Sequence, residues 1–174
     1  MNKIFCCACV SGLLAAVSPS AQAERADREK PIHLEADRLS IDDLNKVQTL
    51  EGNAVLIQGT MELRTSRLVV TQDADGFQKA TATGGANGLA RFRQKREGVD
   101  QYMEGEAERI EHDARSETTQ FFNRAWVRNG LDEVKGQYIS YDALNEKFLV
   151  TTRAGDSKSA TGTAQARVRA IIQP

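Results

Sequence analysis

The chain has 174 residues, of which 40% are hydrophobic, 6% are aromatic and 27% are charged, and its formal net charge is −1 at pH 7. This length suits one domain, and the composition favours a core of small aliphatic side chains over large aromatic clusters. The near-neutral charge excludes the basic surface that nucleic-acid-binding proteins present, so we expect no nucleic-acid partner.

The first 23 residues have the pattern of a secretory signal peptide. Lys3 provides a short positive start, residues 4–17 are apolar, and AQA at residues 21–23 forms a small-x-small cleavage pattern. A membrane-spanning helix needs about 20 apolar residues, so this shorter segment favours a cleaved leader (1–23) over a retained anchor. We therefore expect export to the periplasm, with the mature chain beginning near Glu24.

A charged segment, residues 24–30, follows the leader and is expected to be flexible, before a folded domain that spans residues 31–174. Cys6, Cys7 and Cys9 all lie inside the predicted leader. The exported domain is therefore expected to carry no disulfide and no thiolate metal ligand. Because the cysteines lie near the start of the apolar run and not at its end, lipid attachment is not expected.

The domain contains an internal repeat with an offset of 71 residues. The stretch EADRLSID at residues 35–42 matches EAERIEHD at residues 106–113, and the apolar positions stay in register as far as residues 70 and 141. Self-similarity of this kind indicates two halves with the same arrangement of elements. Each half is expected to hold short strands around a glycine-flanked strand, which in the first half is GNAVLIQG.

Alternation of apolar residues with a period of two predicts which side chains face the interior. In the second half, the stretch NRAWVRNG places Arg124, Trp126 and Arg128 on one face, and therefore Ala125 and Val127 on the inner one. The same alternation and the offset assign further residues to inner faces: Leu39, Ile41, Ala54, Leu56, Leu68, Val70, Ile110, His112, Ile139 and Tyr141.

Short turns separate the predicted strands, with turn-forming pairs such as Asp75-Gly76 and Asn129-Gly130 at close intervals. Many short strands with regular turns predict an all-β sandwich, barrel or roll. No segment is a convincing helix. The alternation in ARVRAIIQP predicts a last strand at about residues 166–172, and residues 32–37 are expected to form the first.

The sequence has few of the groups that enzymes use. It contains no GxSxG, SxxK or P-loop motif, and His33 and His112 do not have a metal-binding spacing. Glu104, Glu106 and Glu108 alternate along one strand face, which allows the paired carboxylates of a glycosidase but is more typical of a solvated face. We expect a binding protein with no catalytic residue, metal or cofactor. An exported carbohydrate-active enzyme is the alternative.

An ordered series of motifs carries a family resemblance. KPIHLEADRLSID begins at residue 30, LEGNAVLIQGTMELRTSRLVVTQD at residue 50, and ARFRQ, MEGEAERIEHD and VKGQYISYD follow in that order. Over about residues 31–150, these motifs resemble the OstA-like proteins of the LptA family. Their order after a cleavable leader is what makes the likeness specific.

The resemblance implies an antiparallel β-jellyroll of roughly sixteen short strands, in which two V-shaped sheets enclose an apolar slot. It implies a periplasmic carrier that shields the acyl chains of lipopolysaccharide and bridges the inner-membrane and outer-membrane transport complexes. The implied partners are lipopolysaccharide through its lipid A moiety, an LptC-like protein of the inner membrane, an LptD-like protein of the outer membrane, and further copies joined head to tail.

The resemblance also implies which residues contact lipid. Ile32 and Phe92 match contact positions of the family, and His112 and Ala114 align with two more, where the family can have a larger tyrosine and leucine. The full set expected to line the slot is Ile32, Leu34, Leu39, Ile41, Ala54, Leu56, Leu68, Val70, Phe92, Ile110, His112, Ala114, Val127, Ile139 and Tyr141. The edge residues expected to mediate association are Ile32, His33, Leu34, Val168, Ala170 and Ile172.

Two further interpretations share the same strand pattern. One is an exported β-roll carrier for a different lipid, such as a phospholipid. The other is a structural module that assembles without lipid cargo. Alternation and turn spacing are identical under all three, so the pattern alone leaves them open.

Overall fold

The computed structural model describes residue 27 and residues 29–74, 76–96, 99–152 and 168–172. The predicted leader, its three cysteines and the start of the predicted last strand lie outside these ranges. Within them, no helix is long and apolar enough to cross a membrane.

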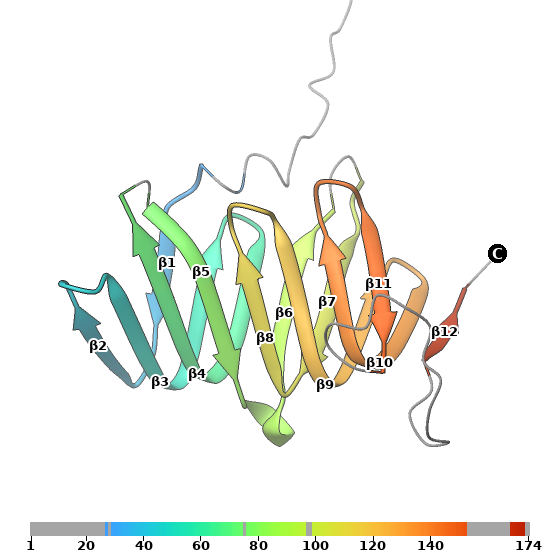
Figure 1. Ribbon diagram of the computed structural model, residues 1–174, viewed down its shortest axis with the longest axis horizontal. Coiled ribbons are helices and arrows are strands. Elements are labelled where there is room, and N and C mark those ends of the chain that lie inside the picture. The colour runs from blue at the N-terminus through green and yellow to red at the C-terminus, as the bar shows by residue number, and fades with distance from the viewer. Residues whose placement is uncertain (1–26, 28, 75, 97–98, 153–167, 173–174) are drawn as a thin grey trace, which may run out of the picture.

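Almost all of the described chain is antiparallel β-structure in one system of twelve strands (Figure 1). One short 3₁₀ turn, η1 (Ala86–Gly88), joins two of them. The strands are β1 (Ile32–Glu35), β2 (Arg38–Asp42), β3 (Val47–Gln58), β4 (Met61–Asp73), β5 (Gly76–Thr83), β6 (Ala90–Lys95), β7 (Tyr102–Ala107), β8 (Arg109–Asp113), β9 (Thr118–Asn129), β10 (Asp132–Asp142), β11 (Lys147–Thr151) and β12 (Arg169–Ile171).

Four long strands, β3, β4, β9 and β10, contribute one half to each of two faces. The first face has the order β2-β3-β4-β5-β8-β9-β10-β11, and the second has the order β1-β3-β4-β6-β7-β9-β10-β12. Because four of the twelve strands are shared, the described chain holds sixteen short segments. The faces join where the long strands bend and separate toward the opposite rim, which gives the expected V-shaped β-jellyroll.

The bends occur where the backbone leaves the usual strand conformation. Gly52 and Asn53 have φ angles of 77° and 45°, and Asn123 and Arg124, 71 residues later, have φ angles of 62° and 48°. The pairing of β3 with β4 shifts register at the first of these places. Positive φ is sterically costly for most residues and is tolerated best by glycine and asparagine, and a bulge of this kind turns a strand sharply.

Acidic side chains hold both bends. Asp37 accepts a hydrogen bond from Asn53 Nδ2 at 3.0 Å. At the equivalent place in the second half, Glu108 accepts hydrogen bonds from Asn123 Nδ2 at 3.3 Å and from Arg124 Nε at 2.7 Å. The role of Glu108 is therefore to stabilise a bend in the fold.

Three turns at the rim of the first face also depend on aspartates. Asp42 and Asp142 each accept hydrogen bonds from the side-chain amide and the backbone N–H of an asparagine three residues later. Asp113 accepts hydrogen bonds from the backbone N–H groups of Ser116 and Arg115. These bonds favour the charged carboxylate and lower the pKa of all three groups.

The repeat in the sequence is also a repeat in the structure. Strands β2, β3, β4 and β5 recur as β8, β9, β10 and β11, each beginning 71 residues later, and the two bends recur with them. The first half and the second half therefore form two consecutive blocks of the same roll.

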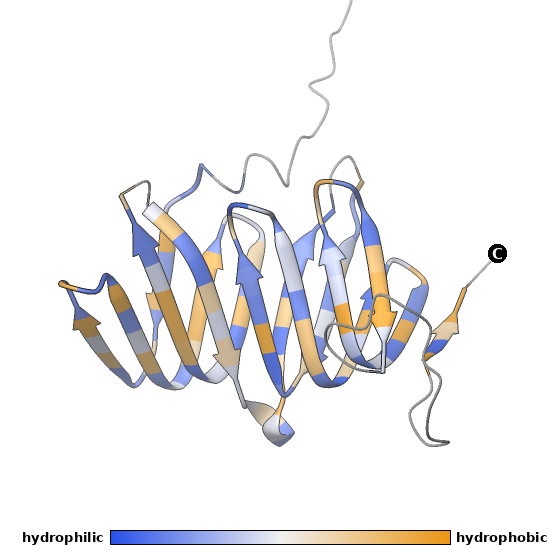
Figure 2. Cartoon of the chain, viewed as in Figure 1, coloured by the Kyte–Doolittle hydropathy of each residue, from blue (hydrophilic) through white to orange (hydrophobic). Residues whose placement is uncertain are grey.

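The core lies between the two faces, and apolar and polar residues alternate along the strands (Figure 2). The predicted parity of β9 is confirmed, because Ala125 and Val127 are buried whereas Arg128 is exposed. The predicted inner residues that are buried are Ala54, Leu56, Leu68, Val70, Phe92, Ile110, His112, Val127, Ile139 and Tyr141.

Two predicted inner residues are exposed, so the expectation that they are buried was wrong. Leu39 and Ile41 on β2 are 48% and 57% accessible. Leu39 pairs across the sheet with the buried Leu50, so both side chains do point toward the inner side. They are accessible because β2 is the last strand of its face, and no described residue covers that end of the roll.

Candidate functional site

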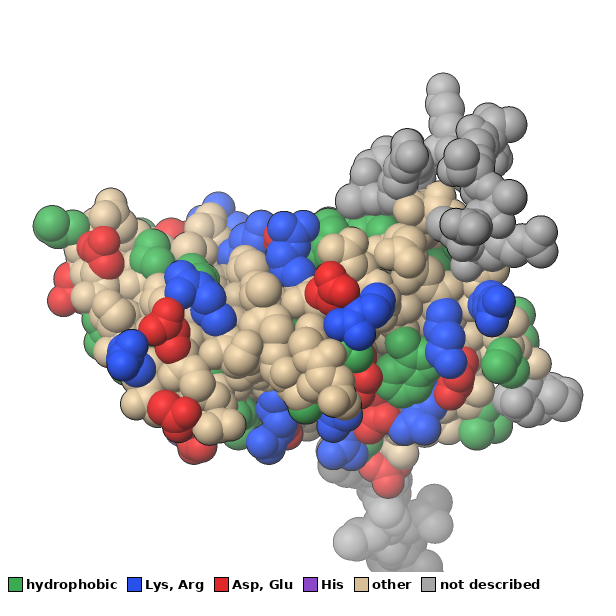
Figure 3. Space-filling view, turned by 90° about the horizontal axis from the view of Figure 1, so that it is seen from below, with side chains coloured by type: hydrophobic (Ala, Val, Ile, Leu, Met, Phe, Trp, Pro, Cys, Tyr) green, Lys and Arg blue, Asp and Glu red, His purple; other side chains and the backbone are tan. Residues whose placement is uncertain are grey.

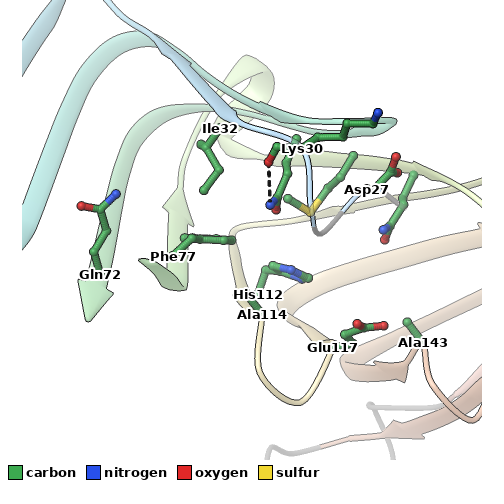
Figure 4. A pocket seen from close by; sticks show the side chains of 12 residues that line it. Asp27, Lys30, Ile32, Gln72, Phe77, His112, Ala114, Glu117 and Ala143 are labelled. Atoms are coloured by element: carbon green, nitrogen blue, oxygen red, sulfur yellow. Dashed lines mark hydrogen bonds between the residues drawn. The ribbon is translucent and has the colours of Figure 1, made fainter. Parts of the chain in front are cut away.

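A cavity of about 380 Å³ lies at the open rim, between the two faces. Ile32 reaches it from β1, whereas Phe77 and His112 reach it from β5 and β8 of the first face (Figure 4). The complete lining is Asp27, Lys30, Ile32, Gln58, Met61, Gln72, Phe77, Gln94, His112, Ala114, Glu117 and Ala143.

Aromatic rings form the floor of the cavity. The His112 ring lies 6.1 Å from the ring of Phe77 and 6.1 Å from that of Phe92, between centroids. Phe92 in turn meets Phe121 edge to face at 6.0 Å. His112 Nδ1 lies 3.0 Å from Thr119 Oγ1, so the imidazole has a polar partner in an otherwise apolar cluster. The floor is thus continuous with the hydrophobic core.

Polar side chains surround the mouth above this floor. Gln58, Gln72 and Gln94 line it together with Lys30 and Glu117. Amide and charged groups at the mouth favour contact with a polar or charged part of a ligand, and the rings below favour an apolar part. The site therefore suits an amphipathic molecule.

The segment that precedes β1 is held against this mouth. Asp27 is buried and accepts a hydrogen bond from Thr60 Oγ1. Gln58 Nε2 donates a hydrogen bond to the Lys30 carbonyl at 3.2 Å. At these described residues the structure differs from the flexible segment expected for residues 24–30, because buried polar groups on the β3–β4 connection bind it.

The structure brings together the four residues that the resemblance placed against lipid. Ile32, His112 and Ala114 line the cavity, and Phe92 is buried directly against the His112 ring. Leu34, on β1, is partly buried against the core. The other predicted slot residues that are buried pack against protein, so their contact with lipid stays a prediction.

Several residues of the cavity were missed from the sequence. Gln58 continues the inner-facing series that contains Ala54 and Leu56, and Gln94 continues the one that contains Phe92. The period-two alternation was therefore a usable signal for both glutamines, although it was read only for apolar residues. Phe77, Met61 and Gln72 lie beside turns, where alternation ends and gives no signal.

His112 makes the stability of this region depend on pH. Burial lowers the pKa of His112 to about 4 from an ordinary value of 6.5, and the nearby Asp113 carboxylate opposes the shift only in part. The unfolded chain therefore binds more protons between these two pH values. We expect the free energy of unfolding to fall by about 3 kcal/mol as pH decreases from 7 to 4 on account of this group.

Urea denaturation at pH 7, 5.5 and 4 checks this expectation, with His112→Phe as the comparison because phenylalanine does not titrate. The carboxyl groups titrate in both chains, so the difference between the two pH profiles isolates the histidine. Parallel profiles would show that His112 is solvated in the native protein and that the cavity floor is not closed.

The two ends of the roll carry unpaired strand edges. Strands β1 and β2 form one end, and β11 and β12 form the other (Figure 1). The described last strand is shorter than predicted, since β12 covers Arg169–Ile171 and pairs with Glu133 to Lys135 of β10. Among the predicted edge residues, His33, Val168, Ala170 and Ile172 are exposed, and Ile32 and Leu34 are partly buried.

The acidic row that allowed a glycosidase interpretation lies on the outer surface of the second face. Glu106 pairs with Arg91 at 2.9 Å, and Glu104 pairs with both Arg93 and Arg128. Basic and acidic side chains are likewise interspersed on the surface seen from the side of the bends (Figure 3). Each carboxylate is engaged by arginine, as expected for a solvated face.

The two histidines do not share a site. His33 is exposed on β1, whereas His112 is buried. In the part of the chain that the structure describes, no group of three or more histidine, cysteine, aspartate or glutamate residues is arranged to hold a metal ion.

Comparison with protein families and sequences places the chain among transport proteins. The family described as "LptA/(LptD N-terminal domain) LPS transport protein" matches residues 33–147. The lipopolysaccharide export system protein LptA of Escherichia coli (strain K12) is 29% identical over 145 residues, which cover 83% of this chain and 77% of that protein. The lipopolysaccharide export system protein LptH of Pseudomonas aeruginosa is 25% identical over 166 residues, which cover 95% and 92% of the two chains.

Comparison with solved structures confirms the fold. The crystal structure of LptH from Pseudomonas aeruginosa, described as the LptA homologous periplasmic component of the conserved lipopolysaccharide transport device, matches with a TM-score of 0.74. The match has 24% sequence identity and covers 85% of this chain and 99% of LptH. The all-β jellyroll expected from the sequence is therefore the observed architecture.

Proposed function

Because this chain belongs to the family of lipopolysaccharide transport proteins that comprises LptA and the N-terminal domain of LptD, we propose that it is a periplasmic carrier of lipopolysaccharide. The family consists of transport proteins and not of enzymes, which confirms that the chain is non-enzymatic. The observation that carries the proposal is the amphipathic cavity at the rim, with an aromatic floor and a polar mouth.

The energetics of lipid transfer explain why such a site is needed. Burial of a methylene group is worth about 0.8 kcal/mol, so one acyl chain of about twelve carbons costs roughly 10 kcal/mol when exposed to water. A lipid with several acyl chains cannot cross an aqueous compartment at a useful rate without protection. In the proposed carrier, the acyl chains of lipid A enter between the two faces, and the phosphate and sugar groups stay at the polar mouth.

The two unpaired ends support a bridging role. An exposed strand edge is a template for a strand of another protein, and the two such edges lie at opposite ends of this roll. We propose that an LptC-like protein binds one end and an LptD-like protein binds the other, with further copies of the chain between them head to tail. The inner rows of apolar residues would then continue from one module to the next.

Photo-crosslinking tests the lipid site directly. Benzoylphenylalanine in place of Phe77, which lines the cavity, is expected to form a covalent adduct with purified lipopolysaccharide under ultraviolet light. The matched control replaces Trp126, an aromatic residue on the outer face beside Arg91 and Glu106. Adduct formation is measured by the mobility shift and by immunoblotting for lipopolysaccharide.

The outcome separates the carrier from its rivals. An adduct at Phe77 and none at Trp126 supports lipid binding at the rim. Equal labelling at both positions would show non-specific adsorption, and labelling at neither would favour a structural module. Competition by unlabelled phospholipid at equal concentration would favour a carrier of a different lipid.

A further inference from the structure

The two halves of the chain meet inside the roll along one internal seam, which we define as the pairing of β5 with β8 and of β6 with β7. In the second face, Arg91 on β6 lies opposite Glu106 on β7, and their side chains form an ion pair at 2.9 Å. In the first face, Ala82 lies opposite Ile110 and Ala80 lies opposite His112, with all four side chains buried. The seam thus has an ion pair outside and apolar pairs inside.

The free ends of the roll consist of the same elements as the seam. The offset of 71 residues relates β7 to β1 and β8 to β2, so Glu106 corresponds to Glu35, and Ile110 corresponds to Leu39. The same offset relates β5 to β11, so that Ala82 corresponds in register to Val150. One end of the molecule is therefore equivalent to one side of its own seam.

The last strand completes this equivalence. Arg91 of β6 lies opposite Arg64 of β4, and Arg169 of β12 lies opposite Lys135 of β10. Because Arg64 and Lys135 are 71 residues apart, β12 occupies the place of β6, and Arg169 occupies the place of Arg91. The sequence of β12 alone does not reveal this relation.

We propose that two copies of this chain join end to end in the register of the internal seam, with β1 and β2 of one copy paired with β12 and β11 of the next. This inference rests on the head-to-tail arrangement proposed above and specifies its contacts. In this register, Glu35 lies opposite Arg169 of the other copy. The corresponding inner pairs are Leu39 with Val150 and Ile41 with Phe148.

The chemistry of the two ends fits this register. Leu39 and Ile41 are largely exposed at one end, and Phe148 and Val150 are only partly buried at the other, so the pairing covers apolar surface that the single chain leaves in water. Strand direction alternates without exception from β1 to β12 and from β2 to β11, so the junction is antiparallel like every pairing inside the roll.

The ion pair specifies the alignment as well as the partner. A shift by one residue would turn every inner side chain outward, and a shift by two would separate Glu35 from Arg169. Both residues are exposed in the single chain and are of opposite charge, like Arg91 and Glu106 in the seam. Opposite charges directly across two strands favour one register over its neighbours.

Disulfide crosslinking tests the register. In a chain whose Cys6, Cys7 and Cys9 are replaced by serine, Glu35→Cys is combined with Arg169→Cys. Cysteines directly opposite on adjacent strands can bridge, whereas positions displaced by two residues are too far apart, so we expect about tenfold more covalent oligomer than in the control. The control combines Glu35→Cys with Ile171→Cys, which lies on the same outer side of β12.

The readout is the ladder of covalent oligomers on a non-reducing gel, with light scattering of the parent chain to measure assembly. A ladder from the Glu35→Cys, Arg169→Cys chain and little from the control supports the register. An equal or stronger ladder from the control, in a chain that assembles end to end, overturns the register and leaves the carrier function intact. No assembly of the parent chain removes the head-to-tail arrangement itself, and the register with it.

Discussion

Deletion of residues 166–174 is expected to leave a folded monomer that binds lipopolysaccharide but no longer assembles end to end. The described part of this segment, β12, pairs only with Glu133, Val134 and Lys135, and all three of its residues are exposed. Its loss removes an edge template while leaving the rim cavity, which it does not line. Light scattering over a range of protein concentrations measures the effect, and circular dichroism checks the fold.

A matched control removes apolar surface from a different place. Leu131, in the turn between β9 and β10, is strongly exposed, and Leu131→Ala is expected to leave assembly unchanged. If the truncated chain still forms rods whose length grows with concentration, the C-terminal edge is not the site of association.

Replacement of Gly105 by alanine is expected to lower the free energy of unfolding by about 3 kcal/mol, because it overfills the core where the two faces come closest. Gly105 on β7 points inward, and a Cβ there would meet the ring of Phe121 more closely than real Cβ contacts allow. Phe121 is itself fully buried and packs edge to face on Phe92, so its ring has little room to move. Urea denaturation measures the loss.

A second substitution identifies the cause. Phe121→Leu in the Gly105→Ala background is expected to recover part of the stability, because the two residues are in contact and their effects do not add. Glu106→Ala, on the same strand but facing outward, removes one exposed ion pair and is expected to cost less than about 1 kcal/mol. A neutral effect of Gly105→Ala would mean that the two faces are not packed together there and that the slot is open along its length.

Several features of the fold were predictable from local pattern. The 71-residue offset predicted two equivalent halves, and the strands and bends recur with that spacing. The alternation in NRAWVRNG predicted that Ala125 and Val127 face inward. These predictions succeed because successive side chains of a strand point to opposite sides of the sheet whatever its neighbours are.

The candidate site was predictable only in part. Ile32, His112 and Ala114 were assigned to lipid contact by family resemblance, and the structure gathers them at one cavity. The glutamines of the mouth and Phe77 come from separate strands that pattern does not connect. Their proximity depends on how the two faces approach each other at the rim, a relation that no local stretch of sequence specifies.

The sequence by itself determined which side of each strand faces inward, where the turns fall and that the chain repeats. Only the tertiary structure decided what covers each inward side chain. Leu39 and Ile110 are equivalent in the repeat and face the same way, but Ile110 is buried at the seam and Leu39 is exposed at the end. The physical reason is that alternation sets direction within a strand, whereas burial requires a neighbouring strand, and the two ends of the roll lack one among the described residues.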